Sequence, residues 1–235
     1  MKIGVLSDIH GNYIALQQSL DFLKRSGVDE VFFLGDAVGY MPKANEVIET
    51  LRTENIKCLS GNHEAMLLGW LPTDPKSEEV YQIDKIRTSL SDSNLSFIKG
   101  LLPFREMVIG NSKFLMVHGS PVDPLNGCVY PDTDLGNLEI LSSYDFILMG
   151  HTHRPFVKRV NDSWFVNVGS CGMPRDAGDL ASLAVINTEK KEPEIIRIPM
   201  DIKAMTLQYK NWVHPDVANL WNRKASENIS GKIIS

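Results

Sequence analysis

The sequence is poor in cysteine, in excess positive charge and in long hydrophobic runs, and each shortage excludes a class of protein. Its three cysteines, Cys58, Cys128 and Cys171, are scattered along the chain and form no CxxC motif. Their number and spacing argue against a disulfide framework or a thiolate zinc site and fit the reducing cytoplasm. No hydrophobic run approaches the roughly 18 residues of a membrane span, and the N-terminal apolar stretch is too short for a signal peptide. We therefore expect a cytoplasmic protein without a membrane partner.

The charge balance further restricts the kinds of partner that the protein can be expected to bind. Lys and Arg total 24 against 29 for Asp and Glu, which gives a formal net charge of −5. A protein that binds long nucleic acids needs a basic face to neutralise phosphates, so this balance argues against that role. It does not exclude a small phosphorylated substrate, because bound metal ions can reverse the local field. The sequence carries no signal for the oligomeric state.

The first third of the chain alternates between strand and helix patterns. Short apolar runs predict strands at Met1–Leu6, Val31–Leu34 and Ile56–Leu59. Helical spacing of apolar residues predicts helices at Asn12–Arg25 and Ala44–Arg52. Strands that alternate with helices indicate a parallel sheet covered by helices, so the fold class is α/β.

The rest of the chain is less regular. Helices are predicted at Glu79–Ser89 and Asn94–Leu101, and further strands at Phe114–Val117, Phe146–Met149, Phe156–Val160, Trp164–Val168, Leu183–Ile186 and Ile195–Ile198. The strand-rich part after Arg154 suggests antiparallel hairpins joined to the earlier sheet. We expect one domain over residues 1–200 and a C-terminal extension, residues 201–235, that Trp212 and Trp221 dock onto it.

Five short segments share one pattern: an apolar strand, then a small residue or glycine, then a side chain that can bind metal. They are Ser7–Asn12, Gly35–Asp36, Gly61–Glu64, His118–Gly119 and Gly150–His153. In open α/β sheets, ligands bind beyond the carboxyl ends of the strands, so these loops could converge on one site. Two of the segments carry donors two residues apart, and in an extended backbone such pairs face the same side.

Each of these residues also has an ordinary structural interpretation. An aspartate after a strand is more often a helix cap or turn residue, a histidine is more often a surface or core residue, and Asn62 could be a left-handed turn residue. The joint placement favours a site, because His214 alone among six histidines lies outside the five segments. The candidate metal ligands are Asp8, His10, Asp36, Asn62, His118, His151 and His153.

The chemistry of this donor set predicts the kind of metal centre. Four imidazoles, two carboxylates and one amide oxygen contain no thiolate, which suits Mn, Fe or Zn. Seven donors exceed what one ion can hold with an open position, whereas two ions that share a carboxylate would use them all. Two ions roughly 3.5–4 Å apart form a clamp for displacement at phosphorus. We expect two divalent transition-metal ions, Mn first, with Fe, Zn, Ni or Co as alternatives.

The ordered motifs resemble those of the calcineurin-like metallophosphoesterases over about residues 1–185. The shared pattern is D-x-H, GD, GNH-[DE], a histidine after an apolar strand, and GHxH, and all five motifs occur here in that order. The resemblance implies a four-layer αββα sandwich of two mixed β-sheets flanked by helices. The family's protein phosphatases carry GDxVDRG at the second motif, whereas Gly35–Tyr40 reads GDAVGY and lacks that arginine. The chain is therefore more similar to the small bacterial and archaeal phosphodiesterases.

The resemblance also implies a role for each residue. Asp8, His10 and His153 would hold one metal, Asn62, His118 and His151 the other, and Asp36 would bridge them. His63 would act at the leaving group, and Asn62 could also contact the substrate phosphate. A later stretch resembles the NxGS…PRD segment of bacterial and archaeal members, which makes Arg175 a candidate phosphate contact; a surface salt-bridge arginine is the alternative.

These observations predict a metal-dependent phosphoric ester hydrolase that activates a water for attack on a phosphodiester or phosphomonoester. Its substrate would be small, with nucleotides among the candidates. A hydrolase of dinucleotide polyphosphates is one alternative, and a non-catalytic scaffold of the same fold or a metal-dependent nuclease are others. We expect the pocket walls to come from Tyr40–Lys43, Trp70–Lys76 and Leu125–Asp134.

Overall fold

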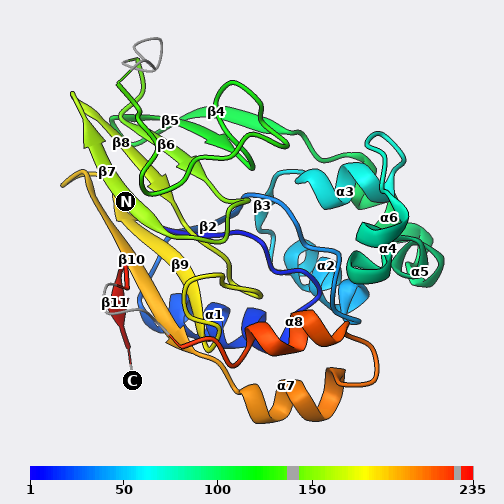
Figure 1. The fold of residues 1–235 in the computed structure, drawn as a ribbon. Coiled ribbons are helices and arrows are strands. Elements are labelled where there is room, and N and C mark those ends of the chain that lie inside the picture. Colours follow the sequence, from blue (N-terminus) through cyan, green and yellow to red (C-terminus); the bar gives the residue numbers. More distant parts are fainter. Residues whose placement is uncertain (137–142, 225–228, 235) are drawn as a thin grey trace.

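The chain folds around two mixed β-sheets that pack face to face (Figure 1). The computed structural model describes residues 1–136, 143–224 and 229–234. The first sheet has the strand order β11-β10-β9-β1-β2-β3. Its strands are β1 (Lys2–Leu6), β2 (Glu30–Phe33), β3 (Lys57–Cys58), β9 (Leu180–Asn187), β10 (Glu192–Pro199) and β11 (Lys232–Ile233). Strands β1, β2 and β3 run parallel, and the β9–β10 hairpin joins β1 in the antiparallel direction.

The second sheet has the order β4-β5-β6-β8-β7. Its strands are β4 (Phe104–Ile109), β5 (Ser112–Val117), β6 (Phe146–Met149), β7 (Phe156–Val160) and β8 (Ser163–Asn167). Strands β5, β6 and β8 run parallel, so their carboxyl ends lie at one edge. The described helices are α1 (Tyr13–Arg25), α2 (Ala44–Thr53), α3 (Asn62–Leu67), α4 (Pro75–Tyr81), α5 (Ile83–Ser89), α6 (Asp92–Lys99), α7 (Ile202–Tyr209) and α8 (Pro215–Leu220).

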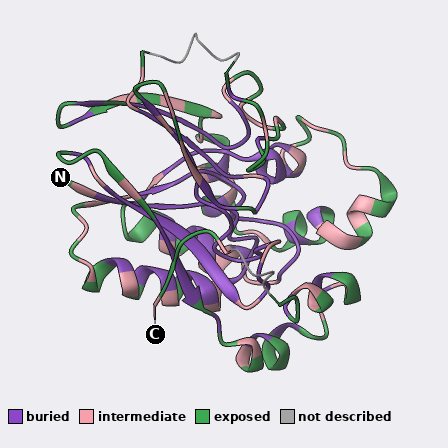
Figure 2. Ribbon diagram, turned by 60° about the vertical axis from the view of Figure 1, so that its left-hand side comes forward, coloured by how far each residue is buried: buried purple, intermediate pink, exposed green. Residues whose placement is uncertain are grey.

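Alternate side chains of the strands build different layers of the core. Ile3 and Val5 of β1 lie in the cluster between the sheets, whereas Leu6 joins the cluster on the helix side of the first sheet. A Cβ at Gly4 would come 2.7 Å from a methyl carbon of Leu23, so helix α1 packs directly on the strand there. Figure 2 shows the buried residues concentrated in the strands and on the inner faces of the helices. The predicted architecture of two mixed sheets flanked by helices is confirmed.

Most predicted elements are present, but the predicted helix Glu79–Ser89 is wrong in one respect. It is two helices, α4 and α5, because Gln82 adopts a left-handed φ of 56° and ends the first of them. The break leaves the carbonyl of Tyr81 free to accept a hydrogen bond from the backbone N–H of Tyr40, at 2.8 Å. The sequence did not predict β4, or α3, which begins at Asn62 in place of a left-handed turn.

The predicted C-terminal extension contains α7, α8 and β11. Met205, Tyr209 and Trp221 are buried in the helix-side cluster, and Trp212 packs against it. Residues 225–228 and 235 of the extension lie outside the described residues, and a boundary at residue 200 stays a prediction. In the ranges that the structure describes, none of the helices combines the length and hydrophobicity needed to cross a bilayer.

Candidate metal centre

The seven candidate metal ligands come together where loops from both sheets meet. Each lies in the loop after a strand or at the start of the following helix. Ligand atoms of Asp8, His10 and His153 lie within 4.8 Å of one another, and so do those of Asp36, His118 and His151. Asn62 Oδ1 lies 3.0 Å from His118 Nε2 and 3.1 Å from His151 Nδ1. The structure thus presents two adjacent groups of donors.

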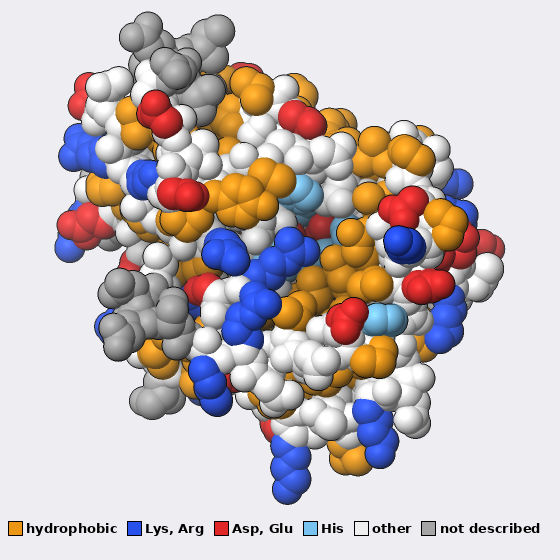
Figure 3. Space-filling model, in the orientation of Figure 1, with side chains coloured by type: hydrophobic (Ala, Val, Ile, Leu, Met, Phe, Trp, Pro, Cys, Tyr) orange, Lys and Arg blue, Asp and Glu red, His pale blue; other side chains and the backbone are white. Residues whose placement is uncertain are grey.

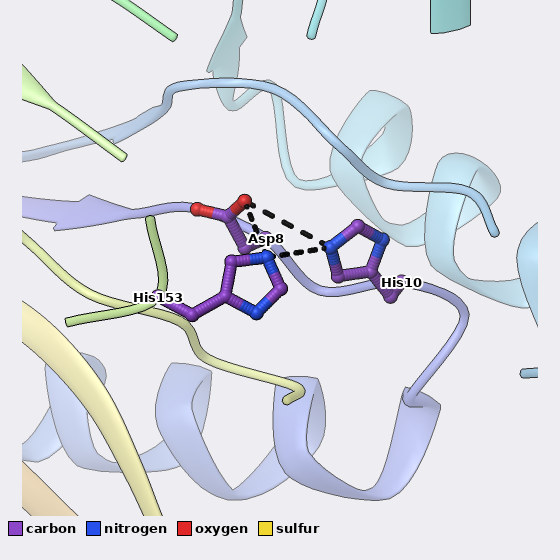
Figure 4. Close-up of side chains that lie close together, drawn as sticks. All are labelled: Asp8, His10 and His153. Atoms are coloured by element: carbon purple, nitrogen blue, oxygen red, sulfur yellow. Dashed lines mark hydrogen bonds and ion pairs between the residues drawn. The ribbon is translucent and has the colours of Figure 1, made fainter. Parts of the chain in front are cut away.

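The first group is compact and buried (Figure 4). Asp8 Oδ1 lies 3.2 Å from His153 Nε2 and 3.8 Å from His10 Nε2. The two imidazole Nε2 atoms face each other at 3.1 Å. Donors from two loops that are far apart in sequence therefore point into one small volume.

Asp36 lies between the two groups. Its Oδ2 is 3.3 Å from His118 Nε2 in the second group and 3.7 Å from His10 Nε2 in the first. Its other oxygen accepts a hydrogen bond from the backbone N–H of His63, at 2.9 Å. A carboxylate in this position can contact an ion in either group.

Backbone carbonyls fix the tautomers of three histidines. The Nδ1 atoms of His10, His118 and His153 lie 2.9, 3.0 and 2.6 Å from the carbonyl oxygens of Val38, Leu34 and Met173, respectively. A carbonyl only accepts, so Nδ1 of each ring carries a proton and Nε2 is the nitrogen that faces the centre. This arrangement is typical of histidines that bind metal.

The electrostatics of the centre fit divalent cations. Asp8 Oδ1 is buried and, among the described residues, accepts no hydrogen bond, although three imidazole nitrogens lie within 4.0 Å of it. Burial raises the pKa of Asp8, but His153 and His118 outweigh burial and lower it. Burial lowers the pKa of His118, but Asp36 outweighs burial and raises it to about 9. Buried carboxylates and lone pairs that face each other need a cation to balance them, so the donor set fits two divalent ions.

The backbone of the ligand loops corrects one expectation from the sequence. The paired donors do not lie in extended segments: φ is positive at Asp8 (55°), His10 (51°), Asp36 (63°), His151 (63°) and His153 (57°). This left-handed conformation costs a non-glycine residue of order 1–3 kcal/mol and clusters at functional sites. Asp8 and His10 enter the same donor group, whereas His151 and His153 enter different ones.

Glu64 holds the Asp36 loop against helix α3. Its carboxylate accepts backbone N–H groups of Gly61 (2.7 Å), Asp36 (2.8 Å), Ala37 (2.7 Å) and Val38 (3.2 Å). Gly61 is required beside it, because a Cβ there would come 2.1 Å from Asp36 Oδ1. One feature of the sequence is consistent with this role, since a glutamate three residues after a helix cap is the spacing of a capping box.

His63 lies at the edge of the metal centre and differs from the other histidines. Its Nε2 is 3.9 Å from Asp36 Oδ2. Its ring stacks on that of Tyr40, with the ring centroids 5.1 Å apart, and packs at a tilt against that of Tyr81, with the centroids 4.7 Å apart. No described residue is hydrogen-bonded to its buried Nδ1. A Cβ at Gly39 would come 2.3 Å from Nδ1, so the glycine makes room for the ring. Burial lowers the pKa of His63 to about 4.

A pocket of about 140 Å³ opens onto the centre and exposes part of it to solvent. Asp36, Asn62 and His63 line it, together with Tyr130 and Arg175. In Figure 3, histidine and acidic side chains lie in a hollow beside a group of Lys and Arg side chains.

The residues that line the pocket can be compared with the wall segments predicted from the sequence. Tyr40, Cys128 and Tyr130 come from two of the predicted wall segments. The segment Trp70–Lys76 contributes no lining residue, and Tyr81 from the end of α4 takes part instead.

Comparisons with known proteins agree with this geometry. Residues 1–191 match the family model of the calcineurin-like phosphoesterase superfamily domain. The chain is 31% identical over 219 residues to the uncharacterised protein MJ0912 of Methanocaldococcus jannaschii, covering 86% of this chain and 88% of that protein. It is 22% identical over 195 residues to phosphodiesterase YfcE of Escherichia coli, covering 80% and 89%. The solved structure of hypothetical protein PH1004 from Pyrococcus horikoshii superposes with a TM-score of 0.81 at 22% identity, covering 95% and 99%.

The fold, the convergence of the motif residues and the comparisons lead to the same family. The chain belongs to the calcineurin-like phosphoesterase superfamily, and it is a phosphoric ester hydrolase.

Proposed function

We propose that the chain hydrolyses a phosphodiester or phosphomonoester of a small molecule at a centre of two divalent metal ions, with Mn²⁺ as the first candidate. The observation that supports this most is the position of Asp36 between two buried donor groups. Asp8, His10 and His153 would hold one ion, and Asn62, His118 and His151 the other, with Asp36 shared. Such ions, when bound, supply a nucleophile from water at neutral pH and neutralise charge on the phosphoryl group.

In this proposal His63 delivers a proton to the leaving group. Within the described ranges, its Nδ1 has no carbonyl partner of the kind that fixes three histidines of the metal groups, so its tautomer is free to change. The stacked ring of Tyr40 holds the imidazole at the pocket wall. A phosphate anion bound beside the ring would raise the low pKa of His63 and favour the protonated form.

Arg175 and Asn62 complete the proposed substrate site. Arg175 lines the same pocket as the metal donors, and a guanidinium there can bind a phosphate oxygen through two N–H groups. The small pocket volume fits a phosphoryl group with a compact substituent. The presence of every predicted metal ligand supports an enzyme over a scaffold, which has no need of a filled site. A cytoplasmic location also remains our proposal.

A substrate panel tests the proposed function. The Mn²⁺-loaded protein is assayed with bis-p-nitrophenyl phosphate, p-nitrophenyl phosphate, 2′,3′-cyclic nucleotides and diadenosine polyphosphates. We expect turnover of the diester or the monoester. Turnover of the diadenosine polyphosphates alone would favour an anhydride hydrolase, and no turnover of any compound by verified metal-loaded protein would contradict the proposal.

A further inference from the structure

The loop after β8 supports the metal centre from behind and carries the proposed phosphate contact. The backbone oxygen of Asp8 accepts hydrogen bonds from Ser170 Oγ (2.7 Å) and Gly172 N (3.0 Å). The carbonyl of Met173 fixes Nδ1 of His153, at 2.6 Å. Three residues after Gly172, Arg175 lines the pocket, and its backbone N–H donates to the carbonyl of His153 at 3.1 Å. The position of this loop therefore decides where the Arg175 guanidinium can reach.

A buried arginine of β10 forms an ion pair with this loop at the residue next to Arg175. Arg197 is fully buried. Its guanidinium forms a two-pronged ion pair with Asp176, with Nη2 to Oδ1 at 2.8 Å and Nη1 to Oδ2, and Nη2 also donates to the carbonyl of Leu180 at 2.9 Å. A buried guanidinium is costly unless it is paired, so the charge pair fixes Asp176 in one position.

A second arginine holds the loop from the end of α8. Arg223 Nη1 donates to the carbonyl of Arg175 at 2.6 Å, and the carbonyl of Arg223 accepts from Gly178 N at 2.8 Å. A Cβ at Gly178 would come 1.7 Å from the carbonyl oxygen of Leu220, so the loop and the end of α8 lie in direct contact. Arg223 itself is exposed, so its side chain can be removed without opening the core.

We infer that Arg197 and Arg223 are positioning residues that hold Arg175 at the phosphate-binding end of the pocket. Both lie after residue 191, where the match to the family model ends. This assigns a role to the C-terminal part of the chain, and it rests on the proposed role of Arg175 as a phosphate contact. A loop fixed before the ligand arrives loses less conformational freedom on binding, and affinity rises accordingly.

Binding of inorganic phosphate to the Mn²⁺-loaded protein, measured by calorimetry, tests the inference without turnover. Arg175→Ala should weaken binding about tenfold, as expected for loss of a charge-assisted contact, and Arg223→Ala about threefold. Because Arg223 acts through Arg175, adding Arg223→Ala to Arg175→Ala should cause no further loss. Arg223→Lys, which can still donate to the carbonyl, should recover most of the affinity.

The controls separate positioning from general damage. Arg159→Ala removes an exposed arginine that pairs with Asp162 in the β7–β8 turn and should leave phosphate affinity unchanged. Metal content and the thermal midpoint of each variant are measured alongside. Equal losses from Arg223→Ala in the wild-type and Arg175→Ala backgrounds would overturn the inference, as would wild-type affinity in Arg223→Ala or a wild-type protein that binds no phosphate. A wild-type protein that binds phosphate but hydrolyses no ester would contradict the proposed function alone.

Discussion

At the scale of single residues, the metal centre depends on side chains whose backbone is held in an unfavourable conformation. Asp8, His10 and Asp36 all have left-handed φ values, which a strand does not have. Hydrogen bonds from Nδ1 to carbonyls then fix which imidazole nitrogen faces the centre. Backbone strain and fixed tautomers together prepare the donors for ions before they bind.

Asp36 is the residue whose loss should affect both donor groups. We expect Asp36→Asn to lower kcat by about 10³-fold or more, because an amide cannot supply the shared negative charge. The fold should persist, since the loop lies at the sheet edge and circular dichroism can check this. Asp84→Asn, at an exposed ion pair with Arg87, is the matched control and should leave kcat unchanged. A near wild-type rate for Asp36→Asn would show that the shared position is wrongly assigned.

His63 should matter in proportion to how much the leaving group needs a proton. For His63→Gln we expect a modest loss with a p-nitrophenyl ester and a loss of about 10²–10⁴-fold with an alkyl or nucleoside ester, because p-nitrophenolate departs unprotonated. The ratio of the two kcat losses is measured with metal content verified. His214→Gln, at the histidine outside the motif segments, serves as control. Equal losses on both esters would reject proton transfer by His63.

At this scale the sequence predicted that Asp, His and Asn residues after apolar strands would converge, and the structure brings them together; their role as metal donors stays a prediction. Two features could not be predicted from the sequence. The contacts of Tyr40 and Tyr81 with the ring of His63 depend on the helix break at Gln82, which no sequence pattern predicts. The left-handed φ values are tertiary in origin, since isolated Asp and His favour other conformations.

At the scale of elements, Glu64 connects helix α3 to the loop after β2. Its carboxylate takes up four backbone N–H groups that would otherwise be buried without acceptors. Burial and the nearby Asp36 together raise the pKa of Glu64 to about 7, although hydrogen bonds from the backbone N–H groups of Gly61 and Asp36 act in the opposite direction. The element that presents Asn62 and His63 is thereby fixed relative to the element that presents Asp36.

Replacement of Glu64 should therefore act on stability and on metal affinity together. Glu64→Gln keeps the shape but offers one acceptor oxygen in place of two, so we expect a loss of about 1–3 kcal/mol in the free energy of unfolding. Metal affinity should fall as well, because the Asp36 loop loses its anchor. Denaturant unfolding and metal titration measure the two effects. Glu54→Gln, at an exposed ion pair with Lys24, is the control; parallel behaviour of the two variants would contradict the anchoring role.

The elements that could be predicted from the sequence are those with strong periodicity or full burial. Strands β6 and β7 have the predicted bounds, because their apolar runs are short and flanked by turn residues. Strand β4 was missed because its residues alternate between exposed and half-buried at the edge of the second sheet, and Phe104 and Val108 remain exposed. Helices α7 and α8 were not predicted, because their burial depends on contacts with α1 and with the loop after β8 that form only in the folded chain.

At the scale of the whole molecule, the candidate metal centre lies where loops from the two sheets meet. Asp8, Asp36 and Asn62 come from the first sheet's loops, whereas His118, His151 and His153 come from those of the second. The sequence indicated that the loops converge but not which strands share a sheet, because strand order follows from long-range pairing. Ions bound across this junction would link the two halves of the fold.

This coupling predicts that metal stabilises the entire chain. Because ions bind the folded state, Mn²⁺ at about 100 times its dissociation constant should add about 2.7 kcal/mol to the free energy of unfolding. The thermal midpoint should rise on adding Mn²⁺ and fall with a chelator. His118→Ala, which removes a second-sheet donor, should lose most of the effect. An unchanged midpoint in the wild type would argue against a junction site.

The most direct test of the account is a titration of verified metal-free protein with Mn²⁺, followed by hydrolysis of the ester that the substrate panel identifies. We predict negligible turnover without metal and a rise that reaches its plateau at two ions per chain, with metal content confirmed by elemental analysis. Full turnover by the metal-free protein, or a plateau at one ion per chain, would contradict a centre in which Asp36 is shared between two ions.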